Sequence, residues 1–416
     1  MTGPVVFAEH AQRATREFAR NGHCSTAASQ WRGMCAESRA AGTQDLDHWF
    51  AEGDGLLRDG TALRGFPPRS AAAFLRALDS VPPSDADPVD RALARRAVDG
   101  LELTWSRYWQ RAAVGDRDHV VADTRSFSSV EMRLRSPDDT TLVTAVPWRA
   151  SQPGASAELV GRAAAGLRRA AALPSAGLPA QPYAIVLDPG HAGAFFHELV
   201  GHPLEADIVA GRSSYLATRA GQRVAPSWFS VWDGAGPPAG GVQARVDDEG
   251  TAVRPAMLID HGRVADALSD ASAASLLGRS SNGHGRRLDY RHFVLPRMWH
   301  TVAAGPGGDP ECSGRPRLRL RGLQLRWMNL ITGEFEFAVS TALLTTAERT
   351  VRVGPFVLGG HGADVLAQLR SAGTTVRTCG ARATKGCGKL NQFPLPVSFA
   401  NSALWFPVEA VHVATS

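Results

Sequence analysis

Hydrophobic residues recur at helical spacing in two stretches of the first 115 residues, 71–81 and 89–114, which a Pro-Pro-Ser-Asp segment separates. This spacing predicts that the beginning of the chain is mostly helical. The period changes at 119–148, where apolar and charged residues alternate across 130–135 and a Pro-Asp-Asp turn leads to a second apolar run at 142–146. Alternation around a turn predicts a β-hairpin. An Ala-rich helix is expected at 155–173.

A proline-rich stretch at 174–182 is the best linker candidate in the chain. After it we expect a short buried strand at 184–187 and a helix that begins near His191. Beyond residue 212 the pattern becomes rich in strands, at 255–259, 318–327 and 334–339, with a bulge at Gly322 and one more helix at 363–371.

These elements predict an α+β protein with two domains. Residues 1–178 would form a helix-rich α/β domain that supplies cavity and dimer contacts. Residues 179–416 would form a domain dominated by antiparallel β-sheet, which carries the helix near His191, because alternating strands are typical of sheets with one face in water.

The composition is that of an ordinary globular protein, with 44% hydrophobic and 20% charged residues in 416 and a net charge of +5. The basic residues are scattered along the chain, which argues against nucleic-acid binding. No uncharged apolar run approaches the ~20 residues of a membrane span, and the first residues lack the features of a signal peptide. We therefore expect a cytoplasmic protein that does not enter membranes. Five irregularly spaced cysteines make a disulfide framework improbable.

The most informative motif is His197-Glu198-Leu-Val-Gly-His202. Two imidazoles beside a carboxylate can form a divalent-metal site, in which the histidines bind the ion and the glutamate takes a proton from water. Their separation of five residues places them about 140° apart on a regular helix, so both could bind one ion only if the helix deforms. Gly201 is the position where it could. The alternative is two histidines satisfied by ordinary hydrogen bonds.

A third protein ligand should come from elsewhere in the chain, since catalytic zinc usually takes three. The candidates from residue type alone are Cys387, Cys379, Glu205 and His191. Cys387 is favoured over Cys379 because it lies in a Lys-Gly-Cys-Gly-Lys segment, whose ammonium groups would lower the pKa of the thiol.

Four segments in this order resemble the TldD/PmbA family of metallopeptidases, and its metal-bearing TldD branch in particular. They are the stretch 187–207 around the histidines, the acidic turn 247–251 with the strand after it, Gly-Arg-Arg at 285–287 with Pro-Arg-Met at 296–298, and Cys-Gly-Lys at 387–389 with Gln392. Together they span more than half of the chain.

The resemblance implies that zinc is held by His197, His202 and Cys387, with Glu198 as the general base. It implies a cytosolic peptidase that forms a heterodimer with a PmbA-like (TldE-like) partner subunit lacking the metal motif, although self-association stays open. It implies small or unfolded peptides as substrates. This sequence departs from the family pattern at His284, at Asn391 and in the segment 393–398, which suggests a specialised member that matures a natural product.

Other residues have two possible roles. Arg286, Arg287 and Asp248 could bind substrate, but the two arginines could equally pair with the acidic turn. Glu205 and Asp207 could hydrogen-bond the zinc-binding histidines or lie on a surface helix. Two further functions remain open beside peptide cleavage: hydrolysis of a non-peptidic natural-product amide at the same site, and a non-catalytic subunit of a TldD/PmbA-like heterodimer.

Overall fold

The computed structural model describes residues 5–19, 24–39, 46–52, 74, 76–78, 100–116, 119–148, 153–234, 241–379 and 386–415. Strands and helices are both present, so the mixed α+β class expected from the sequence is confirmed. The described residues of the N-terminal part, which was expected to be helix-rich, are instead mainly strands. Among all the described residues no helix combines the length and the apolar character needed to cross a bilayer.

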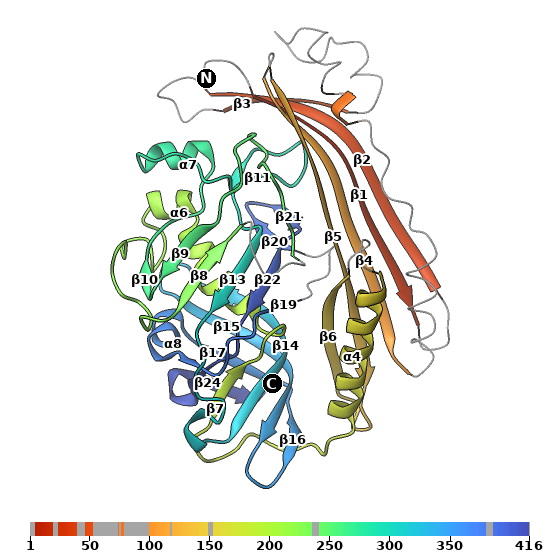
Figure 1. The fold of residues 1–416 in the computed structure, drawn as a ribbon, viewed down its shortest axis with the longest axis vertical. Coiled ribbons are helices and arrows are strands. Elements are labelled where there is room, and N and C mark those ends of the chain that lie inside the picture. The colour runs from red at the N-terminus through yellow and green to blue at the C-terminus, as the bar shows by residue number, and fades with distance from the viewer. Residues whose placement is uncertain are drawn as a thin grey trace.

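The N-terminal part is a six-stranded antiparallel sheet with the order β3-β2-β1-β4-β5-β6. Four of its strands have 14 to 16 residues and curve along one side of the molecule, and one helix packs on the end of the sheet (Figure 1). The elements are β1 (Val5–Phe18), β2 (Cys24–Arg39), β3 (Leu46–Glu52), β4 (Glu102–Gly115), β5 (Val120–Arg135), β6 (Thr141–Trp148) and α4 (Pro153–Ala171).

The helix predicted at 89–114 is wrong where the structure describes that range, because 102–115 is the strand β4. β4 lies between β1 and β5, and most of its side chains are buried on both faces. A strand covered on both faces loses the alternation that marks a strand, and its apolar run can mimic helical spacing. Aromatic side chains such as Trp105 and Trp109 favour the extended form. In the stretch 71–81, Phe74 and residues 76–78 form a helical turn.

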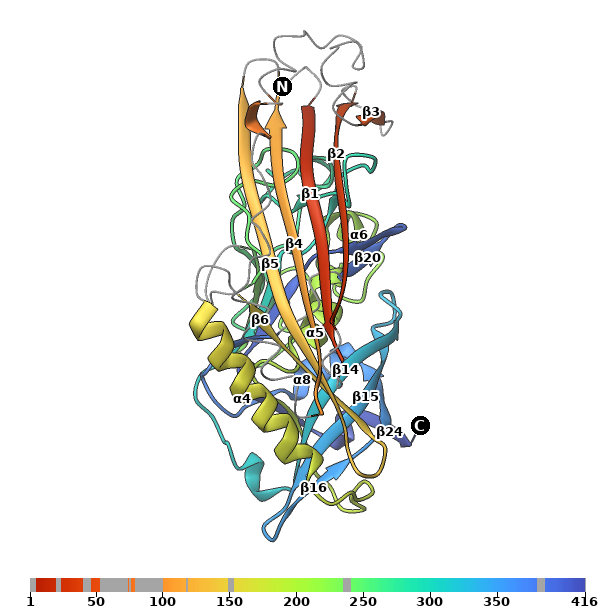
Figure 2. The same ribbon diagram turned by 90° about the vertical axis from the view of Figure 1, so that its right-hand side faces the viewer.

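The C-terminal part contains two larger sheets (Figure 1), and the main hydrophobic core takes side chains from both. Figure 2 shows the strands β1, β2, β4 and β5 of the N-terminal sheet side by side. The first has the order β10-β9-β8-β13-β22-β19, and the second runs β18-β23-β7-β14-β15-β17-β24, with β16 paired to β15. The strands of these sheets include β7 (Ala184–Leu187), β8 (Ser230–Asp233), β13 (His300–Ala304), β14 (Arg317–Met328), β15 (Glu334–Thr345), β19 (Arg377–Cys379), β22 (Ser398–Asn401) and β23 (Leu404–Pro407). The other strands of these sheets are β9 (Ala256–Asp260), β10 (Arg263–Val264), β16 (Thr350–Val353), β17 (Phe356–His361), β18 (Arg370–Ser371) and β24 (Val411–Thr415).

A short helix, α5 (Gly193–Phe196), lies between the two sheets and fixes the segment that follows it. The ring of Phe195 packs on Phe335, Phe337 and Phe406 of the second sheet, with centroid distances of 5.2 to 6.0 Å. The neighbouring Phe196 is also fully buried, against Phe229. Burial of each phenylalanine contributes about 2 to 3 kcal/mol, so the residues after α5 start from a rigid position.

Most local predictions for the remaining chain are confirmed. The hairpin is β5–β6, the Ala-rich helix is α4, and the strands expected at 184–187, 318–327 and 334–339 are β7, β14 and β15. The bulge expected at Gly322 is wrong: the pairing of β14 with β15 runs unshifted past Gly322, and the irregularity lies between Leu325 and Trp327. The residues 174–182 form neither helix nor strand. The domain boundary at 178/179 falls in this segment and stays a prediction.

Candidate metal centre

The two motif histidines lie at the ends of a π-helical turn, η1 (His197–Gly201), which continues directly from α5. The backbone N–H of His202 donates to the carbonyl of His197, which is the i to i+5 bond of a π-helix. This wider turn brings residues five apart to the same side, so the deformation that the spacing required is present. Gly201 allows it to pack closely, because a Cβ there would lie 3.0 Å from Sδ of Met298.

Cys387 completes a cluster of three donors with the two histidines. It lies in β20 (Cys387–Lys389), which forms a small hairpin with β21 (Gln392–Leu395). The ligand atoms of His197, His202 and Cys387 lie within 4.8 Å of one another, and Sγ of Cys387 is 3.0 Å from Nε2 of His202. The two imidazole rings are 5.0 Å apart. The cluster therefore has one thiol and two imidazole nitrogens converging in a largely buried position.

Each histidine is oriented by a hydrogen bond at its other ring nitrogen. Nδ1 of His197 lies 3.3 Å from the hydroxyl of Thr301 in β13, and that hydroxyl donates to Asp233 at 2.7 Å. Nδ1 of His202 lies 3.3 Å from the carboxylate of Glu205. Such bonds fix the ring orientation and the tautomer of metal-binding histidines. They direct both Nε2 atoms towards the thiol side, so the donor set fits a soft divalent ion such as zinc.

Lys389 forms ion pairs with two carboxylates beside the cluster. Its ammonium group lies 3.0 Å from Glu205 and 2.7 Å from Asp207. Burial alone would raise the pKa of Glu205, but Lys389 and His202 lower it to about 2. Glu205 therefore supports His202 as an anion, as the sequence suggested. Asp207 binds Lys389. In the described part of the chain it makes no hydrogen bond or ion pair with either histidine.

The pKa values of Glu198 and Cys387 are shifted in opposite directions. A carboxylate oxygen of Glu198 is 3.9 Å from Nε2 of His202, and the side chain is 18% exposed. Burial raises the pKa of Glu198, which suits a group that must both take and return a proton. Burial would also raise the pKa of the Cys387 thiol, but the charges of His202 and Arg297 lower it well below its ordinary value. The thiolate is the form that binds metal.

Arg297 is the site residue that sequence reasoning missed. Its side chain is fully buried, and two of its guanidinium nitrogens have no hydrogen-bond partner within the described part of the chain. Its charge acts on both Cys387 and Glu205. The sequence contains a signal for Arg297 in the Pro-Arg-Met segment at 296–298, which resembles the family pattern. That segment by itself does not show that Arg297 lies beside the cluster.

The predicted substrate residues lie apart from the cluster, at the contact between the long sheet and the C-terminal part. Asp248 forms an ion pair with Arg125 of β5 and accepts from the backbone N–H of Arg287 at 2.8 Å. The guanidinium of Arg286 stacks 3.7 Å from the ring of Trp299 and donates to the carbonyls of Met298 and Pro396. The ion pair with the acidic turn is thus made by Arg125, while Arg287 binds Asp248 through its backbone N–H and by a bond of 3.3 Å from Nη2 to the Asp248 carbonyl. A role of Arg286, Arg287 or Asp248 in substrate binding stays a prediction.

The other candidate ligands are not part of the donor cluster. His191 lines a separate cavity, and Glu205 binds His202 without joining the three donors. Cys379 ends β19, and its side chain lies outside the described residues. Lys385, which was expected to flank Cys387 on one side, also lies outside them.

The fold and the donor cluster together define an α+β protein with a buried His-His-Cys cluster that could hold a metal ion. A model of the family described as "PmbA/TldA metallopeptidase C-terminal domain" matches residues 180–402, more than half of the chain. The chain therefore belongs to the PmbA/TldD family, as the sequence motifs suggested.

Individual relatives agree with this assignment. The chain is 30% identical over 200 residues to "Metalloprotease TldD homolog" of Haemophilus influenzae, covering 46% of this chain and 40% of that protein. It is 30% identical over 122 residues to "Zinc metalloprotease TldD homolog" of Saccharolobus solfataricus, covering 29% and 27%. The chain thus spans less than half the length of these curated relatives.

Among solved structures, TldE from Thermococcus kodakarensis superposes with a TM-score of 0.73 at 15% identity, covering 99% of this chain and 96% of that one. At this identity the likeness shows that the two share a fold.

Proposed function

We propose that this protein is a zinc-dependent peptidase of the TldD type that cleaves peptide bonds in small or unfolded peptides. The observation that carries the proposal is the convergence of His197, His202 and Cys387 beside Glu198. The name of the Saccharolobus relative supports zinc as the metal. Zinc held by these three residues would polarise the substrate carbonyl and make water more acidic.

The chain's own groups supply the proton transfers. Glu198 takes a proton from water, whose oxygen forms a bond to the carbonyl carbon. The bond from carbon to nitrogen then breaks, and Glu198 gives the proton to the leaving amine. Thr301 and Glu205 hold the two imidazoles in place during the reaction, so the positions of the donors do not have to change.

We further propose that the protein works with a partner subunit of the PmbA/TldE kind. The shared fold with a TldE supports this, since the two chains have the same architecture. The hairpin that carries Cys387 exposes two large apolar side chains, Leu390 at 65% and Phe393 at 59%, which is typical of a surface that another chain or a substrate covers.

A specialised role in the maturation of one natural product is part of the proposal. His284, which replaces an asparagine of the family pattern, is fully buried and lies 3.4 Å from Asp233. Asp233 also accepts from Thr301, which orients His197. His284 is thus connected to His197 through Asp233 and Thr301. A change at this position can alter the orientation of His197 without removing a metal ligand.

Metal content of the purified protein tests the proposal. We expect one zinc per chain in the wild type and loss of zinc in His202→Ala and in Cys387→Ser. His292→Ala and Cys312→Ser are matched controls, because neither residue belongs to the cluster. Glu198→Gln should keep its zinc and lose hydrolysis of unfolded peptides, with and without an added partner subunit.

The outcomes separate the alternatives. If Glu198→Gln leaves all activity intact, the chain is a non-catalytic subunit. If only small amides are cleaved and peptides never are, the protein is an amidohydrolase. A wild type that neither contains nor takes up zinc removes the basis of the proposal.

A further inference from the structure

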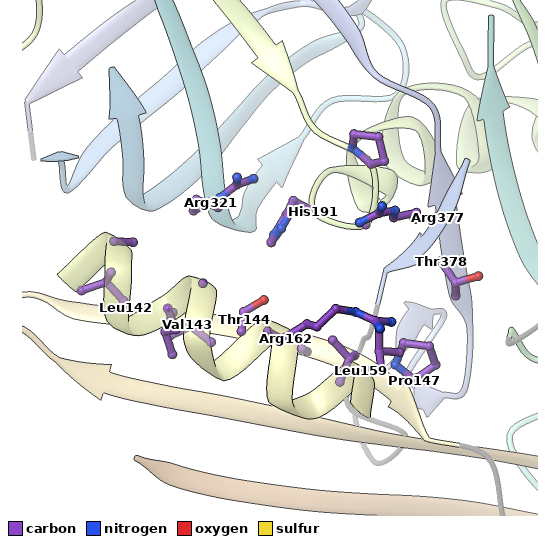
Figure 3. Close-up of a pocket in the computed structure, with 18 of the residues that line it drawn as sticks. Leu142, Val143, Thr144, Pro147, Leu159, Arg162, His191, Arg321, Arg377 and Thr378 are labelled. Carbon is purple, nitrogen blue, oxygen red and sulfur yellow. The ribbon is translucent and has the colours of Figure 1, made fainter. Parts of the chain in front are cut away.

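A cavity of 970 Å³ lies between the N-terminal part and the C-terminal part, apart from the metal cluster (Figure 3). One wall is formed by α4 and β6, and the opposite wall by the loop after β7 with parts of β14, β15 and β19. Its volume is at the upper end of the range for ligand sites in proteins. None of the donors of the metal cluster lines it.

The walls of this cleft combine an apolar floor with a positive rim. Aliphatic side chains of β6 and α4, such as Leu142, Leu159 and Leu167, form the floor. We name as the arginine rim the four arginines that line the cleft: Arg162, Arg169, Arg321 and Arg377. None of the described lining residues is an aspartate or a glutamate, so the rim charges are not neutralised from within the cleft.

Carboxylates of the chain itself neutralise only part of this positive charge. Arg321 binds Asp188 at 2.7 Å, but Asp188 also binds Arg319, so one carboxylate serves two guanidinium groups. Arg162 contacts Glu158 on the exposed face of α4. Arg169 and Arg377 have no carboxylate partner among the residues that the structure describes.

The cleft also contains polar groups that can accept or donate hydrogen bonds. Oγ1 of Thr378 is buried without a hydrogen-bond partner within the described ranges. His191 stands between Arg321 and Arg377 (Figure 3), and burial together with the charge of Arg321 lowers its pKa to about 3, so it is neutral at ordinary pH. A neutral imidazole and a free hydroxyl suit the amide groups of a peptide.

The cleft wall is connected to the metal centre by short segments. His191 lies six residues before His197, at the entrance of α5. Thr378 pairs with Ala400 of β22, and the ring of the preceding residue, Phe399, lies 4.8 Å from the ring of His197. A ligand in the cleft therefore contacts the elements that hold the first metal-binding histidine.

From this placement we infer that the cleft binds the carboxylate-bearing end of a peptide, with aliphatic side chains on the apolar floor and the carboxylates on the arginine rim. Guanidinium groups bind carboxylates through paired hydrogen bonds, and such bonds are stronger than those between neutral groups. The inference that this peptide is a substrate rests on the proposed peptidase function. The binding itself does not depend on catalysis.

Calorimetric titration of the full chain carrying Glu198→Gln tests the inference, since this variant lacks the proposed general base and is expected to bind peptide without cleaving it. The probe is the tetrapeptide Leu-Ala-Leu-Glu as the free acid, compared with the amidated peptide Leu-Ala-Leu-Gln, which has the same shape and no carboxylate. Decanoate serves as a second anion, with an alkyl chain in place of peptide groups.

We expect the free acid to bind at least about ten-fold more tightly than the amidated peptide. Arg377→Gln, and independently Arg169→Gln, should each weaken the free acid by about ten-fold and leave the amidated peptide unchanged. Arg370→Gln removes an exposed arginine outside the cleft and should change neither affinity.

Three results would overturn the inference: equal binding of the acid and the amidated peptide, an equal loss of affinity in Arg370→Gln, or tighter binding of decanoate than of the peptide acid. Thermal unfolding of each variant verifies that it is folded. A protein that binds the acid through the arginines but never cleaves peptides would refute the proposed function and leave the binding site standing.

Discussion

A buried carboxyl at the junction of the two parts should make stability depend on pH. Glu9 of β1 is fully buried and accepts hydrogen bonds from the indole of Trp31 at 2.9 Å, the amide of Gln110 at 2.7 Å and the backbone N–H of Tyr290 at 2.9 Å. Tyr290 belongs to the C-terminal part, so Glu9 joins the long sheet to it. Burial is the largest influence and raises the pKa of Glu9 from 4.5 to about 7.

The sign of the effect follows from this raised pKa. The folded protein holds the proton on Glu9 more tightly than the unfolded chain does, so folding is favoured below pH 4.5 and becomes less favourable as the pH rises to about 7. A shift of this size lowers the free energy of unfolding by about 3 kcal/mol between pH 4.5 and pH 7. Above pH 7 this loss stays constant.

Glu9→Gln keeps the shape of the side chain and cannot ionise, so it should remove this pH dependence. We expect the free energy of unfolding of Glu9→Gln, relative to wild type, to increase by about 3 kcal/mol between pH 4.5 and pH 8. Urea denaturation at several pH values measures it, with the first unfolding transition as the quantity compared. Other titrating groups cancel in the difference between the two proteins.

Glu158→Gln is the matched control, because Glu158 lies exposed on α4 and its replacement should leave the pH dependence unchanged. The reasoning is refuted if the difference between Glu9→Gln and wild type is the same at pH 4.5 and pH 8. It is also refuted if Glu158→Gln changes the pH dependence as much as Glu9→Gln does.

Three further substitutions have definite expected outcomes. Gly201→Ala adds a Cβ at 3.0 Å from Met298 in the π-turn, so it should cost about 1 to 3 kcal/mol in urea denaturation and weaken zinc retention, whereas a variant as stable as wild type would contradict the tight fit. Lys389→Met leaves the buried Glu205 without its ammonium partner and should cost about 3 to 5 kcal/mol, and an unchanged unfolding midpoint would show that the pair is not needed. Arg352→Met removes a buried guanidinium that donates to the end of α4, and limited proteolysis should then cleave the chain faster around 174–182 than in wild type.

Local chemistry determined much of what the sequence predicted correctly. The alternation at 130–146 specifies a hairpin because a turn with Pro137 and two aspartates permits only a short connection. The five-residue spacing of His197 and His202 required a widened turn, and Gly201 made one possible. These features depend on residues close together in the chain, so they can be derived without the fold.

Contacts between distant residues were decided only by the tertiary structure. The sequence could not exclude other ligands for the third position, and the hairpin β20–β21 brings Cys387 to within 3.0 Å of His202, 185 residues away. β4 became a strand because β1 and β5 pair with it and cover its edges, which overrode its helical spacing. Arg286 and Arg297 are buried by residues distant in the chain: Arg286 donates to the carbonyl of Pro396, and Arg297 donates to that of Gln392. The packing of the whole chain determines which charged side chains are buried, so their burial cannot be predicted from the local sequence.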